Sequence, residues 1–304
     1  MVATPWGLLP VADAHVHFFS HAFFASLSEQ KGVAVDHLAP LLTWQLPAED
    51  PQQLADTWAH EFDRHGVAKA SLIASVPGDG ESVISAVRRH PDRFYGYMMV
   101  NPAAPAAIAQ VETALASGCI KALCFFPAMH RYSIQDACVA GLLDLLAARP
   151  QTVAFVHCGV LSVGVRKLLG LPSLFDMRFS NPIDLHAIAL RFPQLRFVVP
   201  HFGAGYLREA LMLCDLCPNV YLDTSSSNSW MRYEEAHLDL RSVFRRALDV
   251  AGPQRLLFGT DSSFFPRGWN SAVFETQSKA LYEIGVNEEV ARLVFHDNLV
   301  RLFS

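Results

Sequence analysis

The sequence predicts an α/β protein, a (β/α)8 or TIM barrel formed as a single domain over residues 1–304. Short apolar segments alternate with amphipathic helical stretches along the whole chain, which is typical of parallel strands connected by helices. No stretch rich in proline, glycine or serine divides the chain, and α/β barrels of this length are commonly one domain.

The alternation assigns eight strands and their helices in order. The strands are expected at 11–17, 70–75, 94–100, 120–126, 153–157, 196–201, 220–223 and 255–261. The helices are expected at 51–65, 81–90, 102–117, 135–149, 182–192, 206–216, 240–251, 272–284 and 287–303. Pro51 suits the first turn of its helix, and Gly66 suits its C-terminal cap. An open, doubly wound sheet is the alternative, but no G-x-G-x-x-G follows the first strand.

The connection after the first strand, 18–50, is unusually long and rich in aromatic residues. A connection of this length is functional or carries a short helix of its own. The aromatic residues in it are Phe18, Phe19, Phe23, Phe24 and Trp44. We expect this long loop to be a lid-like insertion over the barrel mouth, with packing on the barrel side as the alternative.

The composition argues against several classes of partner. The net charge is −5, and no dense run of lysine or arginine indicates a nucleic-acid partner. No uninterrupted apolar run of about eighteen residues indicates a membrane span, and the first ten residues do not resemble a signal peptide. The six cysteines show no disulfide framework, so we expect reduced cysteines in a cytoplasmic protein.

Histidine and aspartate residues stand at the ends of four predicted strands. The first strand reads V-A-D-A-H-V-H, and because side chains alternate along a strand, Asp13, His15 and His17 are expected to point the same way. The fifth, sixth and eighth strands end in His157, His201 and Asp261. The carboxyl ends of parallel barrel strands form one rim, where active sites lie. Imidazole and carboxylate ligands suit zinc, iron or manganese, so these residues predict a metal or catalytic site.

Six motifs carry a resemblance to a known family. They are D-A-H-V-H at 13–17, V-H-C-G at 156–159, P-H-F-G-A-G at 200–205, N-V-Y-L-D-T at 219–224, L-F-G-T-D-S at 257–262 and F-H-D-N-L-V-R-L-F at 295–303. As a set they resemble the amidohydrolase superfamily, in the branch that holds enzymes similar to aminocarboxymuconate-semialdehyde decarboxylase and pyrone-dicarboxylate hydrolase.

The resemblance implies a role for each of these residues. His15, His17, His157 and Asp261 would be metal ligands. His201 would be a further ligand, or the group that polarises the substrate and moves a proton. Asp261 would also act as the general base.

The fourth strand departs from the pattern of many dinuclear members, which have a carboxylated lysine or a glutamate at its end. Here the strand reads I-K-A-L-C-F-F-P, with Lys121 near its start. At about 3.3 Å per residue, a lysine there is badly placed to bridge two metals. We therefore expect one divalent metal ion, with zinc favoured over iron or manganese.

Such a site predicts a metal-dependent hydrolase that acts on a lactone, ester or amide of a small carboxylated substrate through a metal-activated water. The alternative on the same scaffold is a non-oxidative decarboxylase of an unsaturated or aromatic carboxylic acid. A second alternative is a non-catalytic binding protein that contains a metal.

The loops after the strands are expected to carry substrate specificity. They offer Arg131, Arg166 and Arg267, and arginine binds carboxylates through two parallel hydrogen bonds. We predict that these arginines, with His130 beside Arg131, bind a small anionic substrate. Members of the family often pair, so the resemblance also implies a homodimer.

Overall fold

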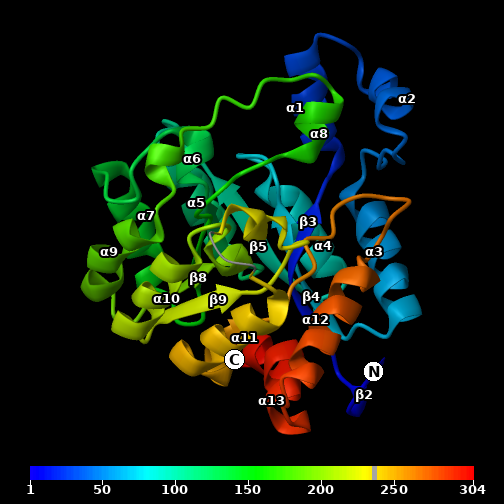
Figure 1. The fold of residues 1–304 in the computed structure, drawn as a ribbon. Coiled ribbons are helices and arrows are strands. Elements are labelled where there is room, and N and C mark those ends of the chain that lie inside the picture. Colours follow the sequence, from blue (N-terminus) through cyan, green and yellow to red (C-terminus); the bar gives the residue numbers. More distant parts are fainter. Residues whose placement is uncertain (235–237) are drawn as a thin grey trace.

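The computed structural model describes residues 1–234 and 238–304. Over these residues, eight parallel strands form one sheet in which each strand pairs with its neighbours in sequence (Figure 1). The strands are β3 (Ala12–Phe18), β4 (Lys69–Ala74), β5 (Phe94–Val100), β6 (Ile120–Phe125), β7 (Val153–Val156), β8 (Arg196–Val199), β9 (Val220–Asp223) and β10 (Leu256–Leu257). The predicted (β/α)8 architecture is confirmed.

The barrel closes between β3 and the residues that directly follow β10. Val16 pairs with Ser262 in a parallel bridge, and the backbone N–H of His17 donates to the carbonyl of Ser262 at 2.7 Å. The backbone N–H of Asp261 donates to the carbonyl of His15 at 3.0 Å. This closing seam therefore runs through residues that the sequence predicts as metal ligands.

The prediction of the last strand, 255–261, was too long, because regular pairing with β9 ends at Leu257. The backbone of Asp261 has a φ of 60°, in the left-handed region, so it cannot continue a strand. The carboxylate of Asp13 accepts hydrogen bonds from the backbone N–H and the hydroxyl of Thr260 at 3.1 and 2.5 Å. These hydrogen bonds to Asp13 replace the strand pairing that Thr260 would otherwise make, and they stabilise the turn that leads to Asp261.

Helices follow the strands and cover the outside of the barrel. They are α3 (Pro51–His65), α4 (Gly80–Arg89), α5 (Ala107–Ala116), α7 (Ala137–Ala147), α9 (His186–Arg191), α10 (Leu207–Leu216), α11 (Leu240–Val250) and α12 (Ser271–Glu283). Helix α3 has the predicted ends: Asp50 caps its first turn, and Gly66 follows it with a φ of 71°. Helix α5 begins later than the predicted 102, because the chain first forms a turn in which Asn101 caps Ala103. None of the helices in the described ranges has the length and apolar character needed to cross a membrane.

The foot of the barrel is closed by elements from both ends of the described chain. These are the antiparallel hairpin β1 (Val2–Thr4) and β2 (Gly7–Leu9), the 3-10 turn η6 (Pro253–Arg255), helix α13 (Glu288–Arg292), a π-helical segment η7 (Leu293–Asp297) and α14 (Asn298–Leu302). Leu299, Leu302 and Phe303 pack into the barrel interior with Cys124 and Phe155. The barrel is therefore a filled core rather than a channel.

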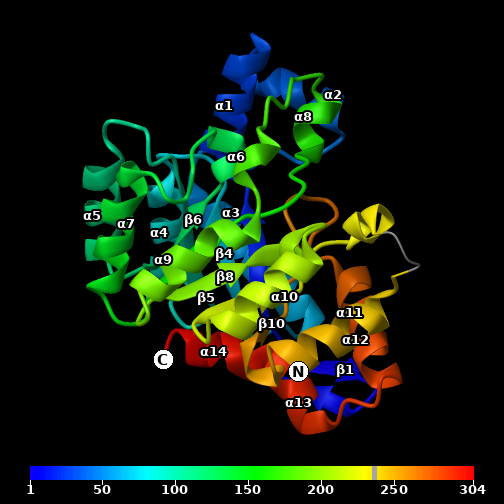
Figure 2. The same cartoon turned by 60° about the vertical axis from the view of Figure 1, so that its left-hand side comes forward.

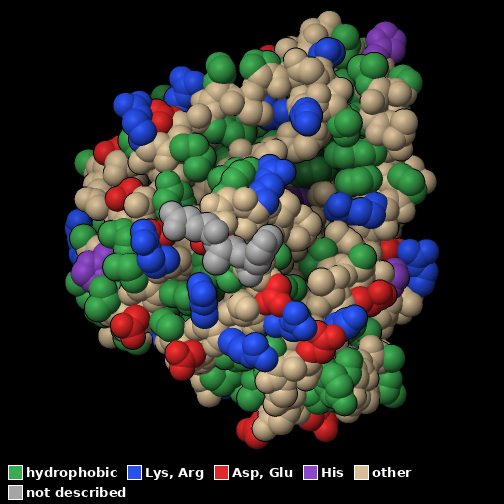
Figure 3. All heavy atoms as spheres, in the orientation of Figure 1, with side chains coloured by type: hydrophobic (Ala, Val, Ile, Leu, Met, Phe, Trp, Pro, Cys, Tyr) green, Lys and Arg blue, Asp and Glu red, His purple; other side chains and the backbone are tan. Residues whose placement is uncertain are grey.

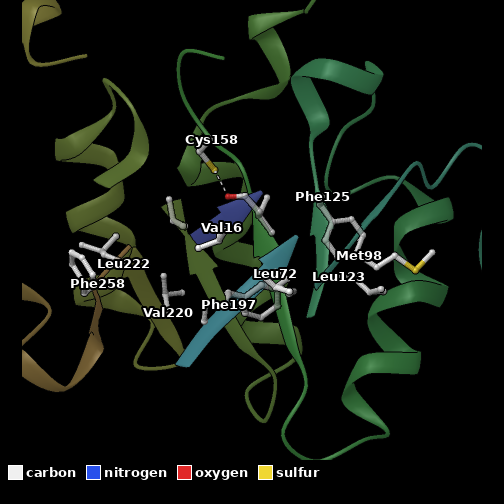
Figure 4. Packing of buried hydrophobic residues seen from close by; sticks show 14 of the residues in the cluster. Val16, Leu72, Met98, Leu123, Phe125, Cys158, Phe197, Val220, Leu222 and Phe258 are labelled. Carbon is white, nitrogen blue, oxygen red and sulfur yellow. Dashed lines mark hydrogen bonds between the residues drawn. The ribbon is translucent and has the colours of Figure 1, made fainter. Parts of the chain in front are cut away.

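A larger apolar layer lies between the strands and the surrounding helices. Successive strands contribute Val16, Leu72, Leu123, Phe197 and Leu222 to it (Figure 4). Because one strand face packs in this layer and the other packs in the barrel interior, the strands read as nearly continuous apolar runs.

Above the rim, the predicted long loop is largely helical. It contains α1 (His21–Lys31), η1 (Val35–Leu38) and α2 (Ala39–Leu42), which stand with α8 (Gly164–Leu168) at the top of the molecule (Figures 1 and 2). Phe24, Leu27 and Leu38 pack with Val165 and Leu169 in a third apolar cluster of their own. This raised part, which we call the cap, is thus held together by its own core. Shorter segments complete the rim: α6 (Pro127–His130), η2 (Met177–Phe179), η3 (Pro182–Leu185), η4 (Pro200–Gly203) and η5 (Ser229–Tyr233).

Candidate metal centre

Two histidines of β3 and the aspartate after β10 meet at the bottom of a cavity of about 1440 Å³. The Nε2 atoms of His15 and His17 lie 3.4 Å apart. The Asp261 carboxylate oxygen Oδ1 lies 3.7 Å from Nε2 of His15 and 3.3 Å from Nε2 of His17. All three potential ligand atoms lie within 4.8 Å of one another. Two imidazole nitrogens and a carboxylate oxygen at this spacing suit a divalent metal ion.

Hydrogen bonds fix which nitrogen of each ring is free to bind a metal. Nδ1 of His15 lies 2.7 Å from the carboxylate of Asp223, which can only accept a hydrogen bond. Nδ1 of His17 lies 2.7 Å from the hydroxyl of Ser75, whose proton is donated to the carbonyl of Ile73 at 2.9 Å. Both Nδ1 atoms are therefore donors, and the lone pairs at Nε2 face Asp261.

The other two predicted histidines line the same cavity. The ring of His201 lies 4.9 Å from that of His15, and its Nδ1 lies 2.9 Å from the hydroxyl of Ser225. The ring of His157 lies 5.3 Å from His201 and stacks on Phe126. Nδ1 of His157 is buried and has no hydrogen-bond partner among the described residues. A buried ring nitrogen without a partner is what a missing ligand contact would leave, so the donor set fits a metal ion.

The charges around the site favour a cation. Burial tends to lower the pKa of His15, but the carboxylates of Asp223 and Asp261 outweigh burial and raise it. Burial tends to raise the pKa of Asp261, but the adjacent His17 and His15 rings, which would be attracted to the carboxylate when protonated, outweigh burial and lower it. Burial is the largest factor that lowers the pKa values of His157 and His201, which keeps both rings neutral and able to bind a metal.

The buried carboxylate of Asp13 connects β3 with the segment that follows β10. Asp13 does not line the cavity, contrary to the expectation that it points the same way as His15 and His17. The pairing of β3 with β4 is irregular between Asp13 and Val16, which breaks the simple alternation. The Asp13 carboxylate accepts hydrogen bonds from the backbone N–H of His15 at 2.9 Å and from Nε1 of Trp269 at 2.8 Å. Burial raises its pKa to about 6, although these hydrogen bonds act to lower it.

The predicted substrate-binding residues line the cavity at two levels, one near the metal ligands and one near the cap. Arg267 lies near the metal ligands, where its Nη2 donates to the carbonyl of Asp261 at 3.2 Å. Its guanidinium lies 4.5 Å above the centre of the Phe264 ring. Arg131 and Arg166 are held instead by backbone carbonyls of the segment 172–174, against the cap. His130 lines the cavity, its Nδ1 is buried without a hydrogen-bond partner in the described chain, and burial lowers its pKa to about 4.

Stacked aromatic rings form one wall of the cavity. The Phe19 ring stacks on Phe23 at 3.9 Å and lies 6.2 Å from the nearly parallel ring of Trp44. Trp44 stacks on Phe264 at 4.0 Å. Of the aromatic residues expected in the long loop, Phe19, Phe23 and Trp44 line the cavity. Phe18 is buried in the barrel wall, and Phe24 is buried in the apolar cluster of the cap. The wall begins at His17, whose ring lies 5.5 Å from that of Phe19.

The sequence analysis missed two serines that orient the histidines. Ser75 holds His17, and Ser225 lies 3.0 Å from Nδ1 of His15 as well as beside His201. Ser75 directly follows β4, and Ser225 lies two residues after β9, on the rim where the predicted ligands also lie. This position is the one signal that could have identified them.

A family model described as amidohydrolase matches residues 12–304. Among curated proteins, Protein fluG of Emericella nidulans is 34% identical over 87 residues. That match covers 29% of this chain and 10% of fluG, so the chain corresponds to about a tenth of that relative's length.

Several solved structures have a similar fold. The 5-carboxyvanillate decarboxylase of Novosphingobium aromaticivorans, with bound manganese and 3-methoxy-4-hydroxy-5-nitrobenzoic acid, has a TM-score of 0.63 at 14% identity over 100% of this chain and 99% of that chain. A probable 2-pyrone-4,6-dicarboxylic acid hydrolase of Acinetobacter baumannii has a TM-score of 0.61 at 13% identity over 97% and 99%. An amidohydrolase of Burkholderia multivorans with bound zinc has a TM-score of 0.61 at 15% identity over 97% and 99%. At these identities the similarity demonstrates the fold alone.

Proposed function

This chain belongs to the amidohydrolase family, and we propose that it is a metal-dependent hydrolase of a small carboxylated lactone, ester or amide. The observation that carries the proposal is the convergence of His15, His17 and Asp261 within 4.8 Å at the bottom of the cavity. A divalent metal ion held there would polarise the substrate carbonyl and make a water molecule more acidic. We propose zinc as the ion, with iron or manganese as alternatives; the zinc and manganese in the two similar structures support a divalent ion.

The protein's own residues would bind the substrate and move its protons. The Asp261 carboxylate, which is held ionised beside His17, accepts the proton of the attacking water. His201 is kept neutral by burial and serves as a further ligand or as the group that polarises the substrate and passes on the proton. We assign His157 as a further ligand because its buried Nδ1 lacks another partner in the described structure.

Two groups that line the cavity would orient the substrate. Arg267 lies over the cavity with no carboxylate within ion-pair distance in the described chain, and we propose that it binds the substrate carboxylate. His130 reaches the cavity as a neutral ring and would hydrogen-bond the substrate's polar edge. The stacked wall from Phe19 to Phe264 would exclude water from one side of the bound molecule.

The fourth strand supports a single metal ion. Lys121 lies near the start of β6, at the foot of the barrel, and Cys124 packs in the filled interior. The rim end of β6 carries Phe125 and Phe126, which have no metal-binding atoms. The strand that bridges two metals in many dinuclear relatives thus offers no bridge here.

A decarboxylase of an unsaturated or aromatic carboxylic acid is a second candidate. The flat wall of Phe19, Trp44 and Phe264 beside His17 would pack against a planar conjugated substrate. The similar fold of 5-carboxyvanillate decarboxylase also favours this candidate. Six free cysteines favour a reducing compartment such as the cytoplasm for either enzyme.

Metal content and product analysis test the proposal together. We expect about one zinc, iron or manganese ion per chain, lost in the His15→Ala, His17→Ala variant but retained in His37→Ala, which alters an exposed histidine of the cap. Lactones, esters, amides and unsaturated acids are then screened with the metal-loaded protein. Release of an acid without carbon dioxide supports the hydrolase, and release of carbon dioxide supports the decarboxylase. Intact metal without turnover of any of these compounds would favour a non-catalytic binding protein.

A further inference from the structure

The cavity is larger than the reaction site at its bottom requires. Its volume of about 1440 Å³ exceeds the roughly 300–1,000 Å³ of pockets that enclose drug-sized ligands. The lining runs from the metal ligands up to the cap, where α1 and α8 contribute Gln30, Arg166 and Leu168. The upper part of the cavity, near the cap, is therefore available to bind a part of the substrate that does not react.

Positive charge is concentrated in this cavity although the protein as a whole is acidic, with a net charge of −5. Among the described residues that line it, one is a carboxylate, Asp261, and five are cationic: Arg131, Arg166, Lys167, Arg232 and Arg267. Figure 3 shows lysine and arginine side chains around the hollow in this face. Clefts lined by one sign of charge attract ligands of the opposite sign.

Some arginines of the described chain pair with carboxylates, but the two upper arginines, like Arg196 and Arg255, donate to backbone carbonyls instead. Elsewhere, Arg89 pairs with Asp56 at 3.0 Å, and Arg241 pairs with Asp239 at 2.6 Å. In the described chain, no carboxylate lies within 4.0 Å of Arg131 or Arg166. Because acidic residues outnumber basic ones, 29 to 24, unpaired arginines at the cavity wall are not explained by a shortage of carboxylates.

Both guanidinium groups are instead fixed by backbone carbonyls of the same short segment. Arg131 donates from Nε and Nη2 to the carbonyl of Leu174 at 2.8 and 2.6 Å. Arg166 donates from Nε and Nη2 to the carbonyl of Pro172 at 3.1 and 2.7 Å. With about 3.8 Å between successive Cα atoms, these two anchors lie within about 8 Å of each other. These bonds leave Nη1 of Arg131 free to donate. Nη1 of Arg166 donates to Oε1 of Gln30 at 2.7 Å and keeps one N–H for a ligand.

We propose that Arg131 and Arg166, with Lys167 beside them, form an outer subsite that binds a second anionic group of the substrate. This inference rests on the proposed function, because it places the reacting group at His15, His17 and Asp261. The substrate is then an elongated dianion, whose outer carboxylate or phosphate is held away from the reacting carboxyl derivative. Fixed guanidinium groups bind such oxyanions with little loss of side-chain freedom.

Calorimetric titration of the metal-loaded protein tests the subsite. The probes are a biphenyl monocarboxylate, the biphenyl dicarboxylate with its groups at opposite ends, and the matching carboxylate–phosphonate. We expect at least one dianion to bind about tenfold more tightly than the monoanion, because the outer anionic group adds charge-assisted hydrogen bonds. The tighter of the two dianions identifies the outer group as carboxylate or phosphate.

The variants separate the outer subsite from the reaction site. Arg131→Gln, Arg166→Gln should bind dianions and monoanion equally, whereas Arg241→Gln, which alters an arginine that pairs with Asp239 away from the cavity, should keep the preference. Equal binding of all probes by the unmodified protein, or a preference that survives in the double variant, would overturn the subsite. The His15→Ala, His17→Ala variant tests the reaction site separately. If it loses binding of all probes, the result supports the proposed function. If it still binds them, the result contradicts the proposed function but not the outer subsite.

A second measurement uses only the unmodified protein, so it still tests the outer subsite if the double variant does not fold. Raising the salt from about 0.01 M to about 1 M shortens the screening length from about 30 Å to about 3 Å. The ratio of dianion to monoanion affinity should fall severalfold over this range. A ratio that does not change with salt would contradict an electrostatic outer subsite.

Discussion

Nδ1 of His15 and the carboxylate of Asp223 lie 2.7 Å apart, and both side chains are almost completely buried. His15 belongs to β3 and Asp223 ends β9, so this contact crosses the barrel interior near the rim. Burial tends to raise the pKa of Asp223, but His15 outweighs burial and lowers it. The carboxylate therefore stays ionised and fixes the orientation of a predicted metal ligand.

Replacement of Asp223 with asparagine should weaken metal binding. Carboxylates that orient ligand histidines typically contribute about 10- to 100-fold to metal affinity. We expect zinc affinity, measured by competition with a chromogenic chelator, to fall by about that factor while the far-ultraviolet circular dichroism is unchanged. Asp215→Asn, an exposed change on α10, serves as the control and should leave the affinity unaltered. Equal affinities in both variants would show that Asp223 does not orient the ligand.

Removal of the metal should destabilise the protein. An ion that binds only the folded state adds about 2.7 kcal/mol when its free concentration is a hundred times its Kd. We expect a chelator to lower the melting temperature by several degrees, because His17 and Asp261 would bind the ion from opposite sides of the closing seam. Calorimetric melting with and without zinc measures this shift. The His15→Ala, His17→Ala variant should show no shift, and a shift of equal size in it would place the ion elsewhere.

His130 should make stability depend on pH. Burial lowers its pKa from about 6.5 to about 4, so between these values the unfolded chain binds a proton that the folded protein does not. Stability is therefore present above pH 6.5 and is lost as the pH falls towards 4. At pH 5 the loss due to His130 should be about 1–2 kcal/mol.

Urea denaturation of metal-free protein at pH 7 and pH 5 measures this effect. His130→Gln should lose less stability between the two pH values than the unmodified protein, while the exposed control His37→Gln should behave like the unmodified protein. Other groups that titrate in this range, including Asp13 with a pKa of about 6, are common to all three proteins and cancel in the difference. Identical losses in all three would mean that His130 is not held neutral.

Alanine substitutions at two glycines should have different effects on stability. Gly159 follows His157 and Cys158 with a φ of +77°, and a Cβ atom there would overlap the carbonyl oxygens of Gly203 and Ala204. We expect Gly159→Ala to cost about 2–4 kcal/mol. Gly164 begins α8 with no atom within 4 Å of an added Cβ, so Gly164→Ala should be neutral or stabilise by up to about 1 kcal/mol. Thermal melting of both variants compares them directly, and equal stabilities would contradict the close approach at Gly159.

The barrel could be predicted because the pattern of an apolar strand followed by an amphipathic helix repeats along the chain. Strands buried on both faces read as apolar runs, and helices such as α3 have recognisable ends at Asp50 and Gly66. The end of the last strand could not be predicted, because Thr260 leaves the sheet for the carboxylate of Asp13, which is 247 residues away in sequence. A short helix in the long connection was one of two expectations, but the position of α1 could not be predicted, since its Phe24 and Leu27 pack with α8 in the cap rather than against the barrel.

The predicted ligands came together because strand ends on one rim must be neighbours. His15, His17 and Asp261 are within ligand distance of one another, and His157 and His201 line the same cavity. The contacts that orient the histidines could not be predicted from the sequence. Serine is a common residue, and Ser75 and Ser225 have a role here only because the fold brings each hydroxyl next to a histidine ring nitrogen. The division of the arginines between two levels depends on backbone carbonyls at 172–174, which no side-chain pattern reveals.

The closing seam also orders events during protein synthesis. A ribosome makes His15 and His17 with β3, but Asp261 emerges only after the seven strands that follow. The nascent chain can therefore present two imidazoles to passing metal ions long before the carboxylate exists. Complete coordination would have to wait until β10 docks beside β3, so we expect selective metal uptake to follow closure of the barrel.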